Sequence, residues 1–437
     1  MARVIVPVSS APLADTLGCS VLVHSLRLTA CLPLFHASRI VQRTMHQIIS
    51  FSEPERWERA YARASCKDIY YRHAYAELCH CMGDGEPFLF VYEDDEDNTV
   101  CYVFIRRPLQ ALPFARDARL EGEWYDIISP TYGYGGPLCA KPHEQLLWEF
   151  RAEFEAWCRG ANIVSEFVRF HPLSDNHRLL EGTMDIVYDR ESVFIDLSRT
   201  EEELFDRYHP GHQRNIRKAL KSGLEFRALE GHEALQQLEV FYRLYRATMD
   251  KVGALPYYYF SMEYLERLFS RLGRSALLGA VFLDGRMISA ALCLREGDVL
   301  IYHLGASEAA SLHLGTNTFQ FHHIALWARR NGLRVFHLGG GHRGRDSLFQ
   351  FKHRFNPEGT LTLNHGKKVH HPEVYERLVE SWKHHHAQPL AESYFPAYRT
   401  PLRVRAEAPD SGEEPSSGHT PRSHGRRHVA PPELSSP

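Results

Sequence analysis

Residues 300–355 read LIYHLGASEAASLHLGTNTFQFHHIALWARRNGLRVFHLGGGHRGRDSLFQFKHRF, and this stretch organises the rest of the chain. Apolar residues recur there at i, i+3, i+4 and i+7 from Phe321, which is the spacing of one helix face. The apolar runs on either side are short and bounded by glycines, as strands are. The stretch therefore predicts, in order, a strand at Leu300–Leu304, a helix that Thr316 or Asn317 caps and Asn331-Gly332 ends, a strand at Leu333–Leu338, and a short helix that contains Phe351 and Lys352.

The second predicted strand runs into a glycine turn surrounded by basic residues. Gly339 and Gly340 allow a sharp turn or a close approach of the backbone to a ligand. The basic residues that follow are His342, Arg343, Arg345, Lys352, His353 and Arg354. Spacing alone fits two interpretations, an ordinary α/β core segment and a ligand site at the strand ends. The combination of glycines, cations and phenylalanines favours the site, with Gly339, Gly340, Arg343 and Arg345 as substrate-binding residues.

Composition is ordinary for a soluble globular protein and excludes several function classes. The 437 residues are 44% hydrophobic and 24% charged, with a formal net charge of -3, so no global basic field attracts nucleic acid and any basic site is a local patch. The nine cysteines are scattered without a CxxC pair, which favours reduced thiols in a cytoplasmic protein. We expect no metal site, because the histidines near the C-terminus lack carboxylate or cysteine partners at ligand spacing.

The chain divides into four segments. Residues 1–44 form an extension upstream of Met45, with an apolar stretch that is too short and too polar to span a bilayer. We predict a first domain at 45–190 and a second at 191–375. The C-terminal segment, 376–437, is rich in Pro, Ser, Gly and charged residues from about residue 403, and that composition predicts disorder.

A loop rich in glycine and tyrosine marks the first domain. It spans residues 130–137, Pro-Thr-Tyr-Gly-Tyr-Gly-Gly-Pro. Tyr132 and Tyr134 offer flat faces with a polar tip, and the glycines allow a close backbone approach. The sequence fits both a tight structural loop and a loop that contacts substrate.

A basic helix marks the second domain. Four cations, Arg214, Arg217, Lys218 and Lys221, are spaced at i, i+3, i+4 and i+7, so they share one helical face. Like charges at this spacing weaken a helix, and an anionic partner relieves that cost. A solvated face is one interpretation. The other is a contact to phosphates, either of a nucleotide-linked or lipid-linked diphosphate or of a tRNA backbone.

The order of these features resembles two tandem GNAT acyltransferase domains, the architecture of the Fem family of peptidoglycan interpeptide-bridge aminoacyltransferases and of related FemAB-like acetyltransferases. The resemblance covers roughly residues 46–375. It is carried by Tyr132–Pro137, Arg214–Ala219 with Gly223, Tyr302–Ala306, His337–Gly341, and Phe351-Lys352 with Phe355.

The resemblance implies an enzyme that transfers an acyl or aminoacyl group from an activated ester to an amine of a cell-wall or cell-envelope precursor. It implies that Lys352 stabilises the oxyanion of the tetrahedral intermediate, or contacts the donor's phosphate, with Phe351 in support. The donor is aminoacyl-tRNA or acyl-CoA, and no cofactor is tightly bound. Glu308, His303, His337 and Asp346 are the candidates for a general base.

Two rival functions remain open at this point. One is an acyl-CoA-dependent N-acetyltransferase that acts on a small amine or a polysaccharide precursor. Against it, residues 305–315 contain Glu308 and no arginine where a coenzyme-A-binding GNAT domain carries its pyrophosphate loop. The other is a non-catalytic GNAT-fold module that binds anionic envelope precursors.

Overall fold

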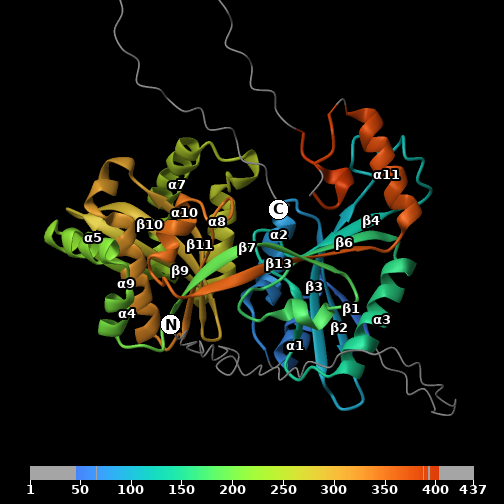
Figure 1. Ribbon diagram of the computed structural model, residues 1–437, viewed down its shortest axis with the longest axis horizontal. Helices are drawn as coiled ribbons and strands as arrows, with labels where there is room; N and C mark the ends of the chain where they lie inside the picture. Colours follow the sequence, from blue (N-terminus) through green and yellow to red (C-terminus); the bar gives the residue numbers. More distant parts are fainter. Residues whose placement is uncertain (1–45, 65, 387, 392–393, 403–437) are drawn as a thin grey trace, which may run out of the picture.

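The computed structural model describes residues 46–402, except 65, 387, 392 and 393. The predicted N-terminal extension at 1–44 and the predicted disorder from about residue 403 lie outside the described residues. Within them the chain forms a mixed sheet flanked by helices, and its two halves lie side by side (Figure 1). The predicted α/β class with a mixed sheet is confirmed.

The first half runs from β1 to η3. Its strands are β1 (Gln47–Ser50), β2 (Glu86–Glu93), β3 (Thr99–Pro108), β4 (Tyr125–Ile128), β5 (Gly136–Cys139) and β6 (Ile163–Arg169). Its helices are α1 (Pro54–Arg63), α2 (His73–Cys81) and α3 (Glu144–Gly160), with 3-10 turns η2 (Ile69–Tyr71) and η3 (Asn176–Leu180). Strands β2 and β3 form an antiparallel hairpin around an acidic turn, in which Asp97 adopts a left-handed conformation.

The second half begins with β7 and extends to β13. Its strands are β7 (Asp185–Asp196), β8 (Glu225–Glu230), β9 (Ala276–Leu283), β10 (Arg286–Glu296), β11 (Val299–Ser307), β12 (Val335–Gly340) and β13 (Thr360–Val369). Its helices are α4 (Glu201–Arg207), α5 (Pro210–Lys221), α6 (Gly231–Gln236), α7 (Leu238–Val252), α8 (Met262–Leu272), α9 (Thr316–Arg330), α10 (Ser347–His353) and α11 (Pro372–His385). Short 3-10 turns are η4 (Pro256–Tyr258), η5 (Gly273–Ser275), η6 (Ala309–Leu314) and η7 (Ala397–Arg399).

The strand order shows that the two halves repeat one design. The sheet runs β1-β2-β3-β4-β6-β13-β7-β12-β11-β10-β9-β8, with β5 paired to β3. Read inward from either edge, the pairings are three antiparallel, one parallel and one antiparallel. The parallel pairs are β4 with β6 and β11 with β12, and β13 pairs with β7 at the centre. The repeat is that of two tandem GNAT-like units, as the sequence predicted.

Strand β7 joins the two halves. The sequence predicted a domain boundary at 190/191. In the structure Asp185–Asp196 form one strand that crosses this boundary, and its pairing with β13 shifts register between Leu363 and Asn364. The predicted boundary therefore lies inside a strand. Strand β13, which follows the boundary in sequence, pairs with β6 of the first half and with β7, so the halves share one continuous set of backbone hydrogen bonds.

The start of α9 differs from the prediction in its cap. Gly315, with φ +83°, stands at the N-cap position, and neither Thr316 nor Asn317 caps the helix. Thr316 Oγ1 donates to the Ser311 carbonyl at 2.7 Å, and Asn317 Oδ1 accepts from Ser307 Oγ at 2.5 Å. The two side chains tie the preceding loop to the helix, because that loop returns close to the helix start. The end of the helix at Asn331 is as predicted.

The C-terminal part of the described chain packs on the first half. Helix α11 and turn η7 cover β4 and β6 through an apolar cluster that includes Trp382 and Tyr398 (Figure 1). Arg399 Nε donates to buried Asp126 Oδ2 at 2.5 Å, and Arg107 Nε donates to Asp126 Oδ1 at 2.8 Å. The segment from 376 onward is therefore anchored through residue 400. Among the described residues, no helix has the length and apolarity needed to cross a bilayer.

Candidate active site

The parallel strands of the second half separate at the place where the sequence placed the ligand site. Strands β11 and β12 pair from Val299↔Val335 to Ile301↔His337. On the other side of β11, the register with β10 shifts between Leu292 and Cys293, so β11 is bulged where it leaves β12. Bulges of this kind re-aim side chains and are common beside active sites.

The corresponding strands of the first half remain tied together. Beyond the end of β4, Ser129 N donates to the Phe167 carbonyl at 3.0 Å, and Gly135 N donates to the Arg169 carbonyl at 2.8 Å. Gly135 and Phe170 then form a parallel bridge. The loop after β4 therefore occupies the position at which the second half opens, so the second half provides the better site.

The glycine turn after β12 is held rigidly. Gly339 has φ +73°, a conformation that favours glycine. Arg190 Nη1 donates to the carbonyls of Gly341 at 3.1 Å and His342 at 2.7 Å. Asp346 caps α10 by accepting from Phe349 N at 2.9 Å, and it also accepts from the backbone N–H of His342 at 2.7 Å. These bonds fix the turn against the start of α10.

Lys352 points from α10 toward this turn. Its side chain is 5% exposed, and Nζ donates to the Gly340 carbonyl at 2.7 Å. Nζ also lies 5.4 Å from the centre of the Tyr302 ring on β11. Burial lowers the pKa of Lys352 to about 7, and the Asp346 carboxylate opposes that shift. A buried ammonium with one neutral partner is poised to stabilise an oxyanion formed beside the opened strands.

Phe351 connects α10 to the basic helix α5. Its ring packs on Phe321 and Phe355, each at 5.6 Å between centroids. Its carbonyl accepts a hydrogen bond from His212 Nε2 of α5 at 2.9 Å. The predicted catalytic pair and the predicted basic helix are therefore adjacent, and His212 is a link that the sequence did not indicate.

The four predicted cations of α5 are all exposed, on the side away from buried Ile216 and Ala219. Lys218 Nζ donates to the His313 carbonyl at 2.7 Å, which joins the helix to η6. The Arg217 guanidinium lies 5.0 Å from the Phe205 ring. The pattern predicted the shared face correctly. Lys218 also serves to hold the loop before α9.

Arg343 and Arg345 lie on the turn between β12 and α10. Arg345 forms a bidentate ion pair with Glu191 of β7, with N–O distances of 2.6 and 2.9 Å. The backbone N–H of Arg343 donates to Asp346 Oδ2 at 3.0 Å. Arg345 thus fastens the turn to the central strand in this structure.

The tyrosine loop is packed between the two halves. The Tyr132 ring lies 5.0 Å from the ring of His303 and 5.2 Å from that of Phe260, both in the second half. A Cβ on Gly133 would meet the Tyr70 ring at 2.5 Å, so the glycine is required for close packing. Tyr134 is buried and lies 5.7 Å from the His337 ring on β12. The loop brings the first half against the strands that form the site.

Three of the general-base candidates have structural partners. Glu308 forms two 2.9 Å bonds with Arg286, Asp346 is the α10 cap, and His303 Nε2 lies 3.0 Å from the hydroxyl of Tyr264. His337 is different. Its Nε2 lies 3.0 Å from Ser192 Oγ, and its Nδ1 is buried without a hydrogen-bond partner among the described residues.

Two further residues near His337 were not identified from the sequence. Asp68 precedes η2, and His171 follows β6. The carboxylate Oδ2 of Asp68 lies 3.8 Å from His171 Nε2, and the His171 ring centroid lies 6.3 Å from that of His337. They are 103 positions apart in the chain and match no motif, so no sequence signal could have paired them.

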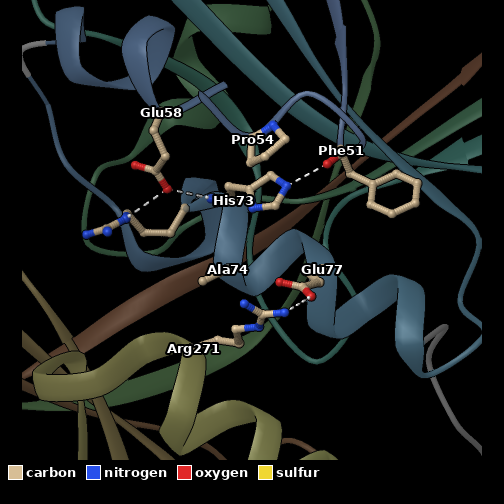
Figure 2. Close-up of a pocket in the computed structure, with 8 residues that line it drawn as sticks. Phe51, Pro54, Glu58, His73, Ala74, Glu77 and Arg271 are labelled. Atoms are coloured by element: carbon tan, nitrogen blue, oxygen red, sulfur yellow. Dashed lines mark hydrogen bonds and ion pairs between the residues drawn. The ribbon is translucent and has the colours of Figure 1, made fainter. Parts of the chain in front are cut away.

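Two surface cavities lie away from these residues. One, of about 500 Å³, lies between α1, α2 and α8, where Glu58, Arg72, Glu77 and Arg271 are engaged in ion pairs (Figure 2). The other, of about 470 Å³, lies beside the start of β7 and includes Lys367, Lys368 and Phe395. Neither is lined by a residue that the sequence predicted. In the described part of the chain, no three His, Cys, Asp or Glu side chains are grouped to hold a metal ion.

Comparisons with known proteins agree with this geometry. The family described as acetyltransferase (GNAT) domain matches residues 210–353, which contain β11, β12 and Lys352. The crystal structure of FemX superposes with a TM-score of 0.55, at 14% identity, over 76% of this chain and 99% of that one. That likeness shows a common fold. A search of curated protein sequences finds no match.

Two other solved structures are more distant. The C-terminal domain of a putative lysylphosphatidylglycerol synthetase from Agrobacterium fabrum has a TM-score of 0.47 at 15% identity, over 75% of this chain and 95% of that one. A tandem GNAT protein from the clavulanic acid biosynthesis pathway has a TM-score of 0.41 at 9% identity, over 75% of this chain and 99% of that one.

Proposed function

We propose that this chain is a FemAB-like tandem GNAT acyltransferase, which transfers an acyl or aminoacyl group from an activated ester to an amine of a cell-wall or cell-envelope precursor; the GNAT family match and the fold shared with FemX support this. The observation that carries the proposal is the opening between β11 and β12 with Lys352 beside it. We place the reaction in the cytoplasm, where activated acyl donors are made.

The chemistry needs few protein groups. The acceptor amine attacks the carbonyl carbon of the ester, a C–N bond forms, and the carbonyl oxygen becomes an oxyanion. The ammonium of Lys352 stabilises that charge, and Phe351 fixes the position of α10. One donor aimed at an oxyanion contributes about 3–4 kcal/mol to transition-state stabilisation. The ester C–O bond then breaks, the oxygen leaves with its electron pair, and it takes up the proton that the attacking nitrogen loses, so the products are a neutral amide and an alcohol. Positioning of two bound reactants supplies the remainder of the rate enhancement.

The phosphates of the donor or acceptor have a natural contact on α5. Arg214, Arg217 and Lys221 are exposed cations, and α5 is bonded to α10 through His212. Tyr132, Tyr134, Gly339, Gly340, Arg343 and Arg345 complete the proposed substrate-binding set. Tyr132 and Tyr134 act from the first half, and the other four form the turn beside Lys352.

Aminoacyl-tRNA is the donor we favour. The residues between β11 and α9 contain Glu308, whose carboxylate is held by Arg286, at the position where a coenzyme-A pyrophosphate would bind. A carboxylate there repels a pyrophosphate. The second candidate is an acyl-CoA-dependent N-acetyltransferase, since the matched family is described as an acetyltransferase domain.

A donor panel tests the proposal. The protein is incubated separately with alanyl-, seryl- and lysyl-tRNA and with acetyl-coenzyme A, each with amino-sugar, amino-acid and UDP-linked muropeptide acceptors. Mass spectrometry then identifies any new amide. Transfer from charged tRNA supports the favoured donor, and transfer from acetyl-coenzyme A alone selects the second candidate. Binding of the UDP-linked acceptor without transfer from any donor would identify a non-catalytic module and reject the enzyme.

A further inference from the structure

The seam between the halves contains a chain of buried titratable side chains that the transfer step above leaves unused. Asp68 and His171 belong to the first half, and His337 lies on β12 of the second half. The Tyr134 ring lies beside both histidine rings, 5.0 Å from that of His171 and 5.7 Å from that of His337, and the two histidine rings are 6.3 Å apart. This series of side chains leads from the first half to the opening between β11 and β12, beside Lys352.

Hydrogen bonds fix the tautomer of His171. Its Nδ1 accepts from the backbone N–H of Leu173 at 3.2 Å. Burial lowers the pKa of His171 to about 3, so the ring is neutral and its proton is on Nε2. The same nitrogen lies 3.8 Å from Asp68 Oδ2, which is within ion-pair range but longer than a hydrogen bond. A carboxylate behind an imidazole is the arrangement that orients a histidine and stabilises positive charge upon it.

Among the described residues, Asp68 has no lysine or arginine partner, which is costly for a buried carboxylate. Its side chain is 10% exposed, and Oδ1 accepts only from Tyr70 N, at 2.9 Å. The groups around it are Tyr61, Tyr70, Tyr71, Tyr134, His171 and Glu296, and the nearby Arg72 is taken up by Glu58 and Glu296. Burial raises the pKa of Asp68 to about 7. An unpaired carboxylate at a domain seam is more often a functional group than a structural one.

His337 supplies the second observation. Its Nδ1 is fully buried and lacks a partner within the described chain, although an unsatisfied ring nitrogen costs free energy. Gly339, two residues further on, has no side chain, and a Cβ there would lie 3.5 Å from Lys352 Nζ. The approach from Lys352 to the histidine is therefore not blocked by a side chain at that position.

We propose that His337 Nδ1 accepts the proton of the attacking amine, and that His171 and Asp68 from the first half are positioning residues, with the Asp68 carboxylate offsetting the positive charge of the imidazolium so formed. Burial, and the positive charge that His171 and Lys352 carry when protonated, lower the pKa of His337 well below its usual range, so its ring is neutral before the amine attacks. This inference rests on the proposed function and assigns the first half a part in the chemistry of the second. The proton then passes from His337 to the leaving oxygen as the C–O bond breaks, so the neutral histidine is restored and the charges balance.

The pH dependence of transfer follows from the protonation of two residues, Asp68 and Lys352. Protonation of Asp68 removes the negative charge behind the histidines, so turnover falls below about pH 7. Deprotonation of Lys352 removes the oxyanion donor, so turnover also falls above about pH 7. We expect a bell-shaped profile of kcat. In Asp68→Asn, the rising limb disappears and the falling limb remains, with kcat at the optimum reduced about 100-fold.

The experiment compares variants in the full chain with the donor that the panel identifies. Asp68→Asn and His171→Gln are measured against His370→Asn. This control removes an equally buried histidine–carboxylate pair, His370 with Glu166 at 3.1 Å, far along the sheet from β11. The control should keep both limbs of the profile, and Asp68→Glu should restore the rising limb. A rising limb that persists in Asp68→Asn at wild-type kcat overturns the proposal.

A second measurement does not depend on any donor. Infrared difference spectra of the wild-type protein between pH 6 and pH 8 should show a protonated carboxyl band that titrates near pH 7 and is absent in Asp68→Asn. Absence of that band from the wild type overturns the inference even if transfer is observed. A band with no transfer from any donor overturns the proposed function instead, so the two failures are distinguishable.

Discussion

Lys352→Met gives a sharp test of the candidate site, because the lysine should cost stability while supporting activity. Methionine has a similar length and no charge. The wild-type ammonium is 5% exposed, and burial lowers its pKa from 10.5 to about 7. A lysine whose pKa is lowered in the folded state destabilises that state wherever it must be protonated. The penalty is therefore complete below pH 7 and disappears as pH rises toward 10.5.

The size of the effect follows from the two pKa values. At 1.36 kcal/mol for each pH unit, the penalty is about 4.7 kcal/mol at pH 6 and about 2 kcal/mol at pH 9. Loss of the Nζ bond to the Gly340 carbonyl opposes this gain by about 1–3 kcal/mol at both pH values. The free energy of unfolding of Lys352→Met, taken relative to that of wild type, should therefore be higher at pH 6 than at pH 9 by about 2–3 kcal/mol.

Urea unfolding of both proteins at pH 6 and pH 9 measures this difference directly. The exposed Lys251→Met is the matched control, and its difference from wild type should be the same at the two pH values. Transfer should be lost in Lys352→Met and retained in Lys251→Met. The reasoning about burial is refuted if the Lys352→Met difference does not change with pH. Wild-type turnover in that variant would remove Lys352 from the site.

Three further predictions follow from other parts of the structure. Replacing Arg214 and Lys221 by alanine should leave the free energy of unfolding within about 0.5 kcal/mol of wild type, because both side chains are exposed. The double variant should bind the donor more weakly and with a flatter salt dependence, measured by titration at 50 and 200 mM salt. Unchanged affinity and salt slope would exclude the α5 face as a donor-binding surface. Arg151→Met should destabilise the first half by about 3–5 kcal/mol at pH 7, because Glu166 then keeps a buried carboxylate without its bidentate partner. Arg151 holds the pKa of Glu166 well below its usual range, so the stability that the pair supplies is present above the ordinary glutamate pKa and is lost as pH falls. The difference in unfolding free energy between the two proteins, measured in urea, should therefore shrink at low pH. Gly133→Ala should lower the melting temperature by several degrees, because its Cβ would lie 2.5 Å from the Tyr70 ring, whereas Gly160→Ala, with open space at its Cβ, should not.

The sequence alone determined the local elements and their chemistry. Apolar spacing around Phe321 predicted α9, because a helix face depends on periodicity within about twenty residues. The shared face of Arg214 and Lys221 was predicted for the same reason. The resemblance to tandem GNAT domains also indicated that the chain contains two similar α/β units.

Only the tertiary structure decided how those units combine. No pattern in residues 185–196 shows that β7 pairs with both β12 and β13, since strand partners are chosen by packing across the whole sheet. Tertiary packing likewise buries the ammonium of Lys352 and sets its pKa, because burial is a property of the neighbours rather than of the residue. Asp68 and His171 become a pair only when the seam closes around them.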